Sequence, residues 1–192
     1  MLARGDRSNF TKCMQVSHVE VNGKVLGVVG AGTIGREVIK VAQALGMKVL
    51  AYTRTPRADE DNLKYVSLEE LLKQSDYISL HCPLTPQTRH MINKETIAMM
   101  KPTAYIINTG RGALIDEPAL IEALKEGRIA GAGLDVQETE PPVQDNPLYD
   151  MPNVILTPHM GWKGLETRQR LVSILAANIQ AFDEGRPQNV VS

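Results

Sequence analysis

The feature that most constrains the fold is a glycine-rich turn that joins a short apolar run to a stretch with helical periodicity. Residues 24–29 (KVLGVV) are apolar and rich in valine, which is typical of a buried strand. Residues 30–35 then read GAGTIG, and apolar side chains recur at helical spacing as far as Gly46, which predicts the end of a helix. A strand, a tight turn and a helix in this order predict the first unit of a parallel sheet.

The same alternation continues along the whole chain. Further strands are expected over residues 47–52, 76–81, 104–108, 129–135 and 153–156, and further helices over residues 68–73, 94–100, 116–127 and 165–184. Right-handed crossovers between such strands put helices on both faces of the sheet. The sequence therefore predicts an α/β fold, a Rossmann-type doubly wound parallel sheet with its ligand crevice at the carboxyl ends of the strands.

The turn itself fits the pattern G-x-G-x-x-G in the context that gives the pattern meaning, after a strand and at the start of a helix. Gly30 permits the tight turn, Gly32 leaves room for a pyrophosphate, and Gly35 lets the helix pack against the strand. The helix N-terminus adds N–H groups and a partial positive charge. The predicted dinucleotide site includes Thr33 and Ile34 between these glycines, and the alternative is an ordinary tight turn.

The end of the second strand bears on the choice between NAD and NADP. An acidic residue there would bind the adenosine ribose hydroxyls of NAD, but the chain has Thr53, followed by Arg54 and Arg57. A hydroxyl followed by guanidinium groups is suited to a ribose 2′-phosphate. These residues favour NADP over NAD. The alternative is that both arginines are solvated loop charges and that NAD binds without the usual carboxylate.

Composition excludes several other classes of function. The 192 residues carry a net charge of −1 and only 4% aromatic side chains, which argues against nucleic-acid binding. No apolar run reaches the ~18 residues of a membrane helix, and residues 1–13 do not resemble a signal peptide. The two cysteines, Cys13 and Cys82, form no metal or redox motif, which favours a reducing cytoplasm.

The four histidines are scattered along the chain, so no metal site is expected. His81 precedes Cys82-Pro83 in a predicted turn, which favours a structural role. His18 and His90 lie in no supporting pattern.

Five further motifs identify a family. They are residues 80–85 (LHCPLT), 108–112 (NTGRG), 133–136 (GLDV), 138–141 (ETEP) and 157–161 (TPHMG). Together with the glycine turn, they occur in the order seen in D-isomer-specific 2-hydroxy-acid dehydrogenases. The chain resembles the NAD(P)-binding domain of that family over roughly residues 10–191.

The resemblance implies three catalytic residues. Arg111 matches the arginine that holds the substrate carboxylate, His159 matches the general acid/base, and Glu140 matches the carboxylate that pairs with the histidine. Each residue type suits its role, because arginine binds a carboxylate bidentately and histidine titrates near neutrality. Taken singly, each has a plain alternative as a surface ion pair, a loop cap or a solvated loop charge.

The resemblance also extends the predicted cofactor site beyond the glycine turn. The added residues are Cys82, Pro83, Thr88, Thr109, Gly110 and Asp135. Asp135 matches a family residue near the nicotinamide carboxamide, and its alternative role is to form a turn at a strand end.

The surroundings of His159 indicate a branch of the family. Trp162 and the residues that follow it look similar to glycerate dehydrogenases and to hydroxypyruvate or glyoxylate reductases. The resemblance therefore implies a small 2-oxo or 2-hydroxy acid as substrate. Trp162 has an equally plain alternative as a packing residue at the start of a helix.

The chain departs from the family before the first strand. Family members carry about a hundred residues there, in a substrate-facing domain, whereas this chain carries residues 1–23. We therefore expect residues 1–192 to be a single dinucleotide-binding domain, with the substrate domain absent and residues 2–19 a remnant of an N-terminal helix that serves a homodimer interface. Three hypotheses remain: an oxidoreductase, a dinucleotide-binding module without turnover, and a split enzyme whose other domain is a separate chain.

Overall fold

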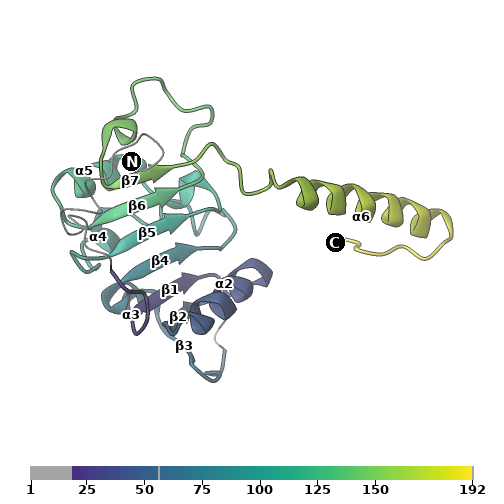
Figure 1. Cartoon of the computed structure of the whole chain (residues 1–192), viewed down its shortest axis with the longest axis horizontal. Coiled ribbons are helices and arrows are strands. Elements are labelled where there is room, and N and C mark those ends of the chain that lie inside the picture. Colours follow the sequence, from purple (N-terminus) through teal and green to yellow (C-terminus); the bar gives the residue numbers. More distant parts are fainter. Residues whose placement is uncertain (1–18, 56, 192) are drawn as a thin grey trace, which may run out of the picture.

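The computed structural model describes residues 19–55 and 57–191. In that part of the chain seven strands form one parallel sheet in the order β3-β2-β1-β4-β5-β6-β7 (Figure 1). The strands are β1 (Val25–Val29), β2 (Lys48–Tyr52), β3 (Leu63–Tyr65), β4 (Tyr77–Leu80), β5 (Tyr105–Asn108), β6 (Gly131–Leu134) and β7 (Val154–Leu156). The predicted doubly wound α/β sheet is confirmed. The order reverses between β1 and β4, and such a switch point is where ligands bind at the carboxyl ends of strands.

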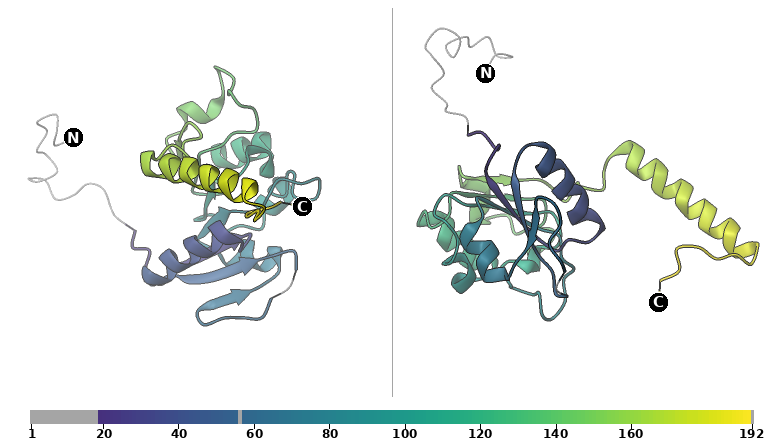
Figure 2. Two further views of the ribbon diagram at one scale, coloured as in Figure 1. Left: turned by 90° about the vertical axis from the view of Figure 1, so that its right-hand side faces the viewer. Right: turned by 90° about the horizontal axis from the view of Figure 1, so that it is seen from below.

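Helices lie on both faces of the sheet. On one face is α2 (Thr33–Ala44), and on the other are α3 (Leu68–Gln74), α4 (Lys94–Ile97) and α5 (Glu117–Lys125) (Figure 2). The alternation of side chains along β1 divides the core, because successive residues of a strand point to opposite faces. Val28 packs in the cluster that contains Ile39 of α2, whereas Val29 packs in the larger cluster that contains Leu71 of α3.

Side-chain caps explain where two of these helices begin. The Ser67 Oγ atom accepts a hydrogen bond from the backbone N–H of Glu70 at 3.1 Å, at the start of α3. Asp116 caps α5 in the same way, with its carboxylate 3.2 Å from the backbone nitrogen of Ala119. By contrast, the N-cap residue of α2 is Gly32, so this helix has no side-chain cap, and its first turn has no acidic residue. Its first N–H groups are therefore left for a ligand or for water.

The last helix, α6 (Leu165–Asp183), lies apart from the sheet. It extends away from the body of the molecule (Figure 1), and none of its residues is buried. Its apolar side chains recur on one face as the sequence indicates, yet Leu171 is 65% exposed and Phe182 is 75% exposed. Periodicity predicted the helix correctly, but it carried no information on whether a neighbour covers that face.

The structure differs from the sequence-based expectations in one further place. Residues 63–65 form the edge strand β3, which the sequence analysis did not assign to any element. The expected N-terminal helix falls on residues 2–19, which lie outside the described residues except for Val19, so it stays a prediction. Among the described residues, no helix is both long enough and apolar enough to cross a membrane.

Candidate active site

The glycine-rich turn lies at the switch point, between the end of β1 and α2. Gly30 has a φ of +100°, and a Cβ atom there would lie 2.6 Å from the backbone nitrogen of Cys82. A Cβ at Gly35 would lie 2.1 Å from the carbonyl oxygen of Gly30. Around Gly32, in contrast, a Cβ would meet nothing within 4 Å. Thr33 and Ile34 are exposed beside this open space, so a pyrophosphate fits against the uncapped end of α2.

The residues predicted to contact the adenosine ribose follow β2. The Thr53 hydroxyl donates a hydrogen bond to the carbonyl oxygen of Thr55 at 2.7 Å. The hydroxyl oxygen of Thr53 can still accept a hydrogen bond from another group. Arg54 and Arg57 are exposed on the same loop. Their guanidinium groups are therefore open to a solvent-borne anion.

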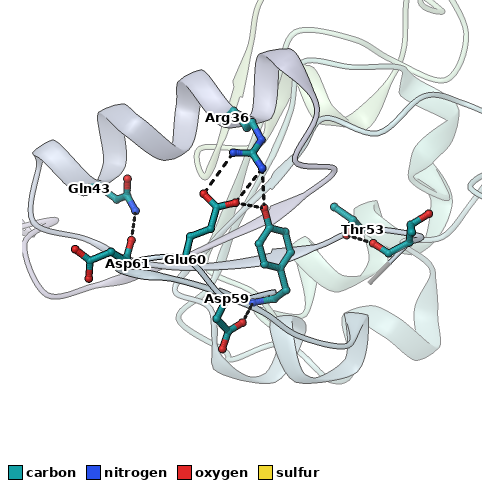
Figure 3. Close-up of polar contacts among 8 residues, drawn as sticks. Arg36, Gln43, Thr53, Asp59, Glu60 and Asp61 are labelled. Carbon is teal, nitrogen blue, oxygen red and sulfur yellow. Dashed lines mark hydrogen bonds and ion pairs between the residues drawn. The ribbon is translucent and has the colours of Figure 1, made fainter. Parts of the chain in front are cut away.

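A polar cluster that the sequence analysis missed ties this loop to α2 (Figure 3). The guanidinium of Arg36 contacts both carboxylate oxygens of Glu60, at 2.9 and 3.4 Å, and its Nη2 atom also lies 3.3 Å from the Tyr65 hydroxyl. Further along α2, the Gln43 side chain donates to the carbonyl oxygen of Asp61 at 3.3 Å. The Glu60–Asp61 end of this loop is therefore held against α2.

The loop after β4 carries three of the predicted cofactor residues. Cys82 packs beside Gly30, and burial raises the pKa of its thiol. The Thr88 hydroxyl donates to the carbonyl oxygen of Pro83 at 2.7 Å and accepts from the backbone nitrogen of Thr85 at 2.8 Å. The hydroxyl of Thr88 therefore holds the loop in shape, and Pro83 is exposed at its start.

The loop after β5 is held by the last residue of that strand. Asn108 is buried, its carboxamide oxygen accepts from the backbone nitrogen of Gly110 at 3.0 Å, and its nitrogen donates to the carbonyl oxygen of Arg111 at 2.9 Å. Thr109 and Arg111 are exposed on this loop. The Asn108 side chain thus orients the backbone that presents Thr109, Gly110 and Arg111 at the edge of the sheet.

The structure brings the three predicted catalytic residues together. The Nδ1 atom of His159 lies 2.7 Å from Oε2 of Glu140. Both residues and Arg111 line a cavity of about 190 Å³. They come from the loops after three different strands, β5, β6 and β7, so the parallel sheet is what assembles them. Leu84, from the loop after β4, completes the apolar side of the cavity.

The pKa of Glu140 shows how the charges are balanced. The hydrogen bond with His159 lowers this pKa most, burial opposes it, and the backbone N–H of Gln137 and the charges of His159 and Arg111 lower it further. Glu140 is therefore ionised near neutral pH. Its carboxylate holds Nδ1 of His159, which leaves Nε2 as the ring atom available to a substrate.

Asp135 lies directly after β6. The family resemblance predicts that it lies near the nicotinamide carboxamide. Its carboxylate is buried and accepts hydrogen bonds from the Thr157 hydroxyl at 2.5 Å and from the backbone nitrogens of Met160 and Gly161, both at 2.9 Å. Its carbonyl oxygen accepts from the backbone nitrogen of His159 at 2.8 Å. Asp135 therefore holds the loop that presents His159, which is the turn-forming role that the sequence left open.

These bonds predict a pH dependence of folding. Burial alone would raise the pKa of Asp135, but the hydrogen bonds from Thr157, Met160 and Gly161 and the charge of His159 outweigh it and lower the pKa. A lowered folded-state pKa contributes stability above the unfolded value of about 3.9, and that stability is lost as the pH falls through the folded-state value.

We therefore expect Asp135→Asn to reduce the free energy of unfolding at neutral pH by about 1–3 kcal/mol, and to flatten its decline below about pH 5. Urea unfolding at a series of pH values measures both effects. Asp150→Asn, at an exposed carboxylate, is the matched control. Parallel pH curves for Asp135→Asn and the native chain would contradict this role.

Two of the remaining histidines are described. Nε2 of His81 lies 2.9 Å from the Ser79 hydroxyl, and burial lowers the pKa of the imidazole, in keeping with a structural role. Nε2 of His90 lies 2.6 Å from the carboxylate of Glu138, a contact between residues 48 positions apart that has no local sequence signal. His18 is outside the described residues. No cluster of three or more histidine, cysteine or acidic side chains suited to a metal ion occurs in residues 19–55 and 57–191.

His159 and Glu140 also line a second hollow, of about 510 Å³. Its lining is mainly apolar and includes Tyr149 and Leu156. Trp162 is 54% exposed, so its side chain is not packed as a core residue.

Known proteins of one family are similar to this chain. Residues 3–161 match the family described as "D-isomer specific 2-hydroxyacid dehydrogenase, NAD binding domain". A hydroxypyruvate reductase of Blautia hydrogenotrophica is 50% identical over 176 residues, which are 91% of this chain and 55% of that protein. A glyoxylate reductase of Thermococcus litoralis is 49% identical over 90% of this chain and 53% of that protein. The chain thus spans about half the length of these relatives.

Solved structures show the same fold. A D-lactate dehydrogenase with NAD+ from Lactobacillus jensenii superposes on 100% of this chain and 61% of its own, with a TM-score of 0.86 and 36% identity. An acyclic imino acid reductase in complex with NADPH and D-Arg covers 100% of this chain and 62% of its own, with a TM-score of 0.84 and 35% identity. On this evidence the chain belongs to the D-isomer-specific 2-hydroxyacid dehydrogenase family and comprises its NAD-binding domain.

Proposed function

We propose that the chain binds a nicotinamide dinucleotide as a single domain and serves hydride transfer to and from a small 2-oxo or 2-hydroxy acid. The observation that carries this proposal is the His159–Glu140 pair, 2.7 Å apart, beside Arg111 on one cavity wall. An arginine that binds a carboxylate and a histidine that exchanges a proton are the two groups such a reaction needs next to the cofactor.

Each residue has a distinct part in the proposed mechanism. When bound, the nicotinamide supplies the hydride to the substrate carbonyl carbon. Arg111 holds the substrate carboxylate and so fixes the direction of the carbonyl. Nε2 of His159 donates a proton to the carbonyl oxygen as negative charge develops there, and Glu140 stabilises the imidazolium through Nδ1. In the oxidation direction, neutral His159 takes the hydroxyl proton.

The residues that would hold the cofactor fit a dinucleotide. The proposed contacts are the glycine turn, Thr53 and Arg54, with Cys82, Pro83, Thr88, Thr109, Gly110 and Asp135 further along the edge. Three features support this: the open space at Gly32, the uncapped N-terminus of α2, and the exposure of Arg54. We propose NADP as the preferred cofactor, because Arg54 and Arg57 bring positive charge where a carboxylate would favour NAD.

The preference for NADP can be tested through Arg54. Arg54→Ala is expected to weaken NADPH binding about tenfold and to leave NADH binding unchanged, because only NADPH carries the 2′-phosphate. Calorimetric titration with each cofactor measures both affinities. Arg168→Ala on α6 is the control for loss of an exposed arginine. Equal losses for the two cofactors, or no loss for either, would refute the preference.

For the substrate we propose a small 2-oxo acid such as hydroxypyruvate or glyoxylate. The similar proteins from B. hydrogenotrophica and T. litoralis are a hydroxypyruvate reductase and a glyoxylate reductase, and the cavity beside Arg111 is small. The test is oxidation of NADPH and NADH by the purified chain with each acid. Turnover dependent on either acid supports the proposal, and absence of turnover with either cofactor would contradict it.

A second candidate is a dinucleotide-binding module without turnover. The observation that favours it is that the side chains of Glu140 and His159 are each more than a third exposed. Exposure weakens orientation and admits water. Cofactor binding without turnover would support this module, whereas activity recovered on adding a separate substrate domain would support a split enzyme.

We further propose a cytoplasmic homodimer that binds neither nucleic acid nor membrane. Support for the dimer comes from exposed apolar side chains on α6 and on the edge strand β7, where Ile155 is 72% exposed. The near-neutral net charge supports the absence of nucleic-acid and membrane binding, and the presence of only two cysteines supports a cytoplasmic location. A monomer at micromolar concentration in analytical ultracentrifugation would refute the homodimer.

A further inference from the structure

The side chain of Glu138 links two loops beside the proposed catalytic residues. Glu138 follows β6, and its side chain is 22% exposed. Its Oε1 atom lies 2.6 Å from Nε2 of His90 and 2.9 Å from Nη2 of Arg89, both on the loop after β4. A carboxylate that meets two cationic or hydrogen-bonding groups on a neighbouring loop holds the two loops together.

The backbone at Glu138 is fixed as well. Its N–H donates to Oε2 of Glu117, in the first turn of α5, at 3.1 Å. The carboxamide nitrogen of Asn146, a residue that is 4% exposed, donates to Oε1 of Glu117 at 2.7 Å and to the Gln137 side chain at 3.1 Å. The peptide between Gln137 and Glu138 is therefore held by the loop after β4, by α5 and by a buried asparagine.

This fixed peptide lies between the proposed catalytic groups. On one side, the N–H of Gln137, which belongs to the preceding peptide unit, donates to Oε1 of Glu140 at 3.1 Å, while Oε2 of Glu140 lies beside His159. On the other side, a Cβ on Gly112 would lie within 2.4 Å of three backbone atoms of this peptide, so the loop that carries Arg111 rests directly on it. A shift of the peptide would move Glu140 and Arg111 relative to each other.

We propose that Glu138 is a positioning residue, which fixes Glu140 and thereby His159 opposite Arg111. The inference rests on the proposed function of these three residues. Glu138 borders the same cavity, but its Oε1 atom is engaged by Arg89 and His90. It acts through the peptide that it holds.

The pKa of Glu140 offers a test with a decisive sign. The negative charge of Glu138 repels that of Glu140. If this repulsion were its only effect, removing the charge of Glu138 would lower the pKa of Glu140. Loss of position would instead weaken the bonds from Gln137 and His159, which hold that pKa below its ordinary value, and would raise it. A raised pKa of Glu140 therefore indicates that Glu138 positions Glu140, whereas a lowered pKa indicates that Glu138 acts only through its charge.

The experiment is a carboxyl-carbon NMR titration of Glu140 in the full chain, in two Glu138 variants and in one control variant. We expect Glu138→Ala to raise the pKa of Glu140, and Glu138→Gln, which keeps an acceptor for His90, to raise it less. Glu122→Ala, at an exposed carboxylate of α5 that pairs with Arg128, is the control and should change nothing. An unchanged pKa, or an equal decrease in both Glu138 variants, overturns the proposal.

A kinetic measurement distinguishes the positioning role of Glu138 from the proposed enzymatic activity. Where the chain turns over, Glu138→Ala should lower kcat roughly tenfold or more at an unchanged KM for the dinucleotide, with partial rescue by Glu138→Gln. The NMR result does not depend on turnover. A raised Glu140 pKa without any turnover would leave the positioning role in place and refute the proposed activity alone.

Discussion

Replacing His159 with alanine is expected to reduce turnover of a 2-oxo acid by about 10²–10⁴-fold, the range for loss of a positioned general acid or base. The imidazole is held at Nδ1 by Glu140 at 2.7 Å, and its loop is held by Asp135, so the proton donor is fixed in one position. Dinucleotide affinity should change little, because the glycine turn lies at the other end of the cofactor site.

Steady-state kinetics and a calorimetric titration with NADPH measure the two quantities separately. Lys163→Ala, at an exposed side chain four residues away, is the control. Glu140→Gln should lie between the native chain and His159→Ala, since a neutral amide still accepts a hydrogen bond but no longer stabilises an imidazolium. Native turnover by His159→Ala would exclude this histidine as the proton donor.

Gly112→Ala is expected to produce the second large effect, through the backbone. The added Cβ would lie 1.9 Å from the carbonyl oxygen of Gln137, 2.0 Å from its carbonyl carbon and 2.4 Å from the nitrogen of Glu138. None of these atoms can rotate away, so the loops after β5 and β6 must separate. Overpacking of this kind costs about 1–3 kcal/mol, and a displacement near 1 Å of a catalytic group lowers turnover about a hundredfold.

Thermal unfolding and turnover together test this prediction. A matched control is Gly133→Ala in β6, where the nearest atom to the added Cβ is 4.0 Å away. We expect the control to remain close to the native chain in both measurements. Gly112→Ala with the native unfolding temperature and native turnover would contradict the close contact between the two loops.

Local patterns were sufficient to predict most of the fold. The short apolar runs predicted β1 and β2, and capping residues such as Ser67 and Asp116 predicted the starts of α3 and α5. The strand β3 escaped notice because three residues are too few to show a period. For α6 the period was visible, but its exposure depends on neighbours that no local pattern records.

The candidate site also has some features that the sequence predicts and others that it does not. Arg111, Glu140 and His159 each follow a strand, and parallel strands bring their carboxyl ends to one edge, so their meeting could be predicted. The pairs Arg36–Glu60 and His90–Glu138 join residues 24 and 48 positions apart, and single-sequence periodicity carries no signal for such contacts. Asp135 was found from its motif, yet its three hydrogen bonds to the His159 loop emerged only in three dimensions.

The most direct test of the proposed dinucleotide site concerns Gly32, where a pyrophosphate is proposed to approach the backbone. A Cβ at this position meets nothing within 4 Å, and Gly32 has a φ of −80°, so Gly32→Ala should fold normally. The methyl group would nevertheless fill the space against the N-terminus of α2. Calorimetric titration of the native chain and Gly32→Ala with NADPH and NADH is the measurement. We predict binding by the native chain and at least about tenfold weaker binding by Gly32→Ala, at an unchanged unfolding temperature. Equal affinities in the two proteins would contradict the proposed approach of the pyrophosphate to Gly32.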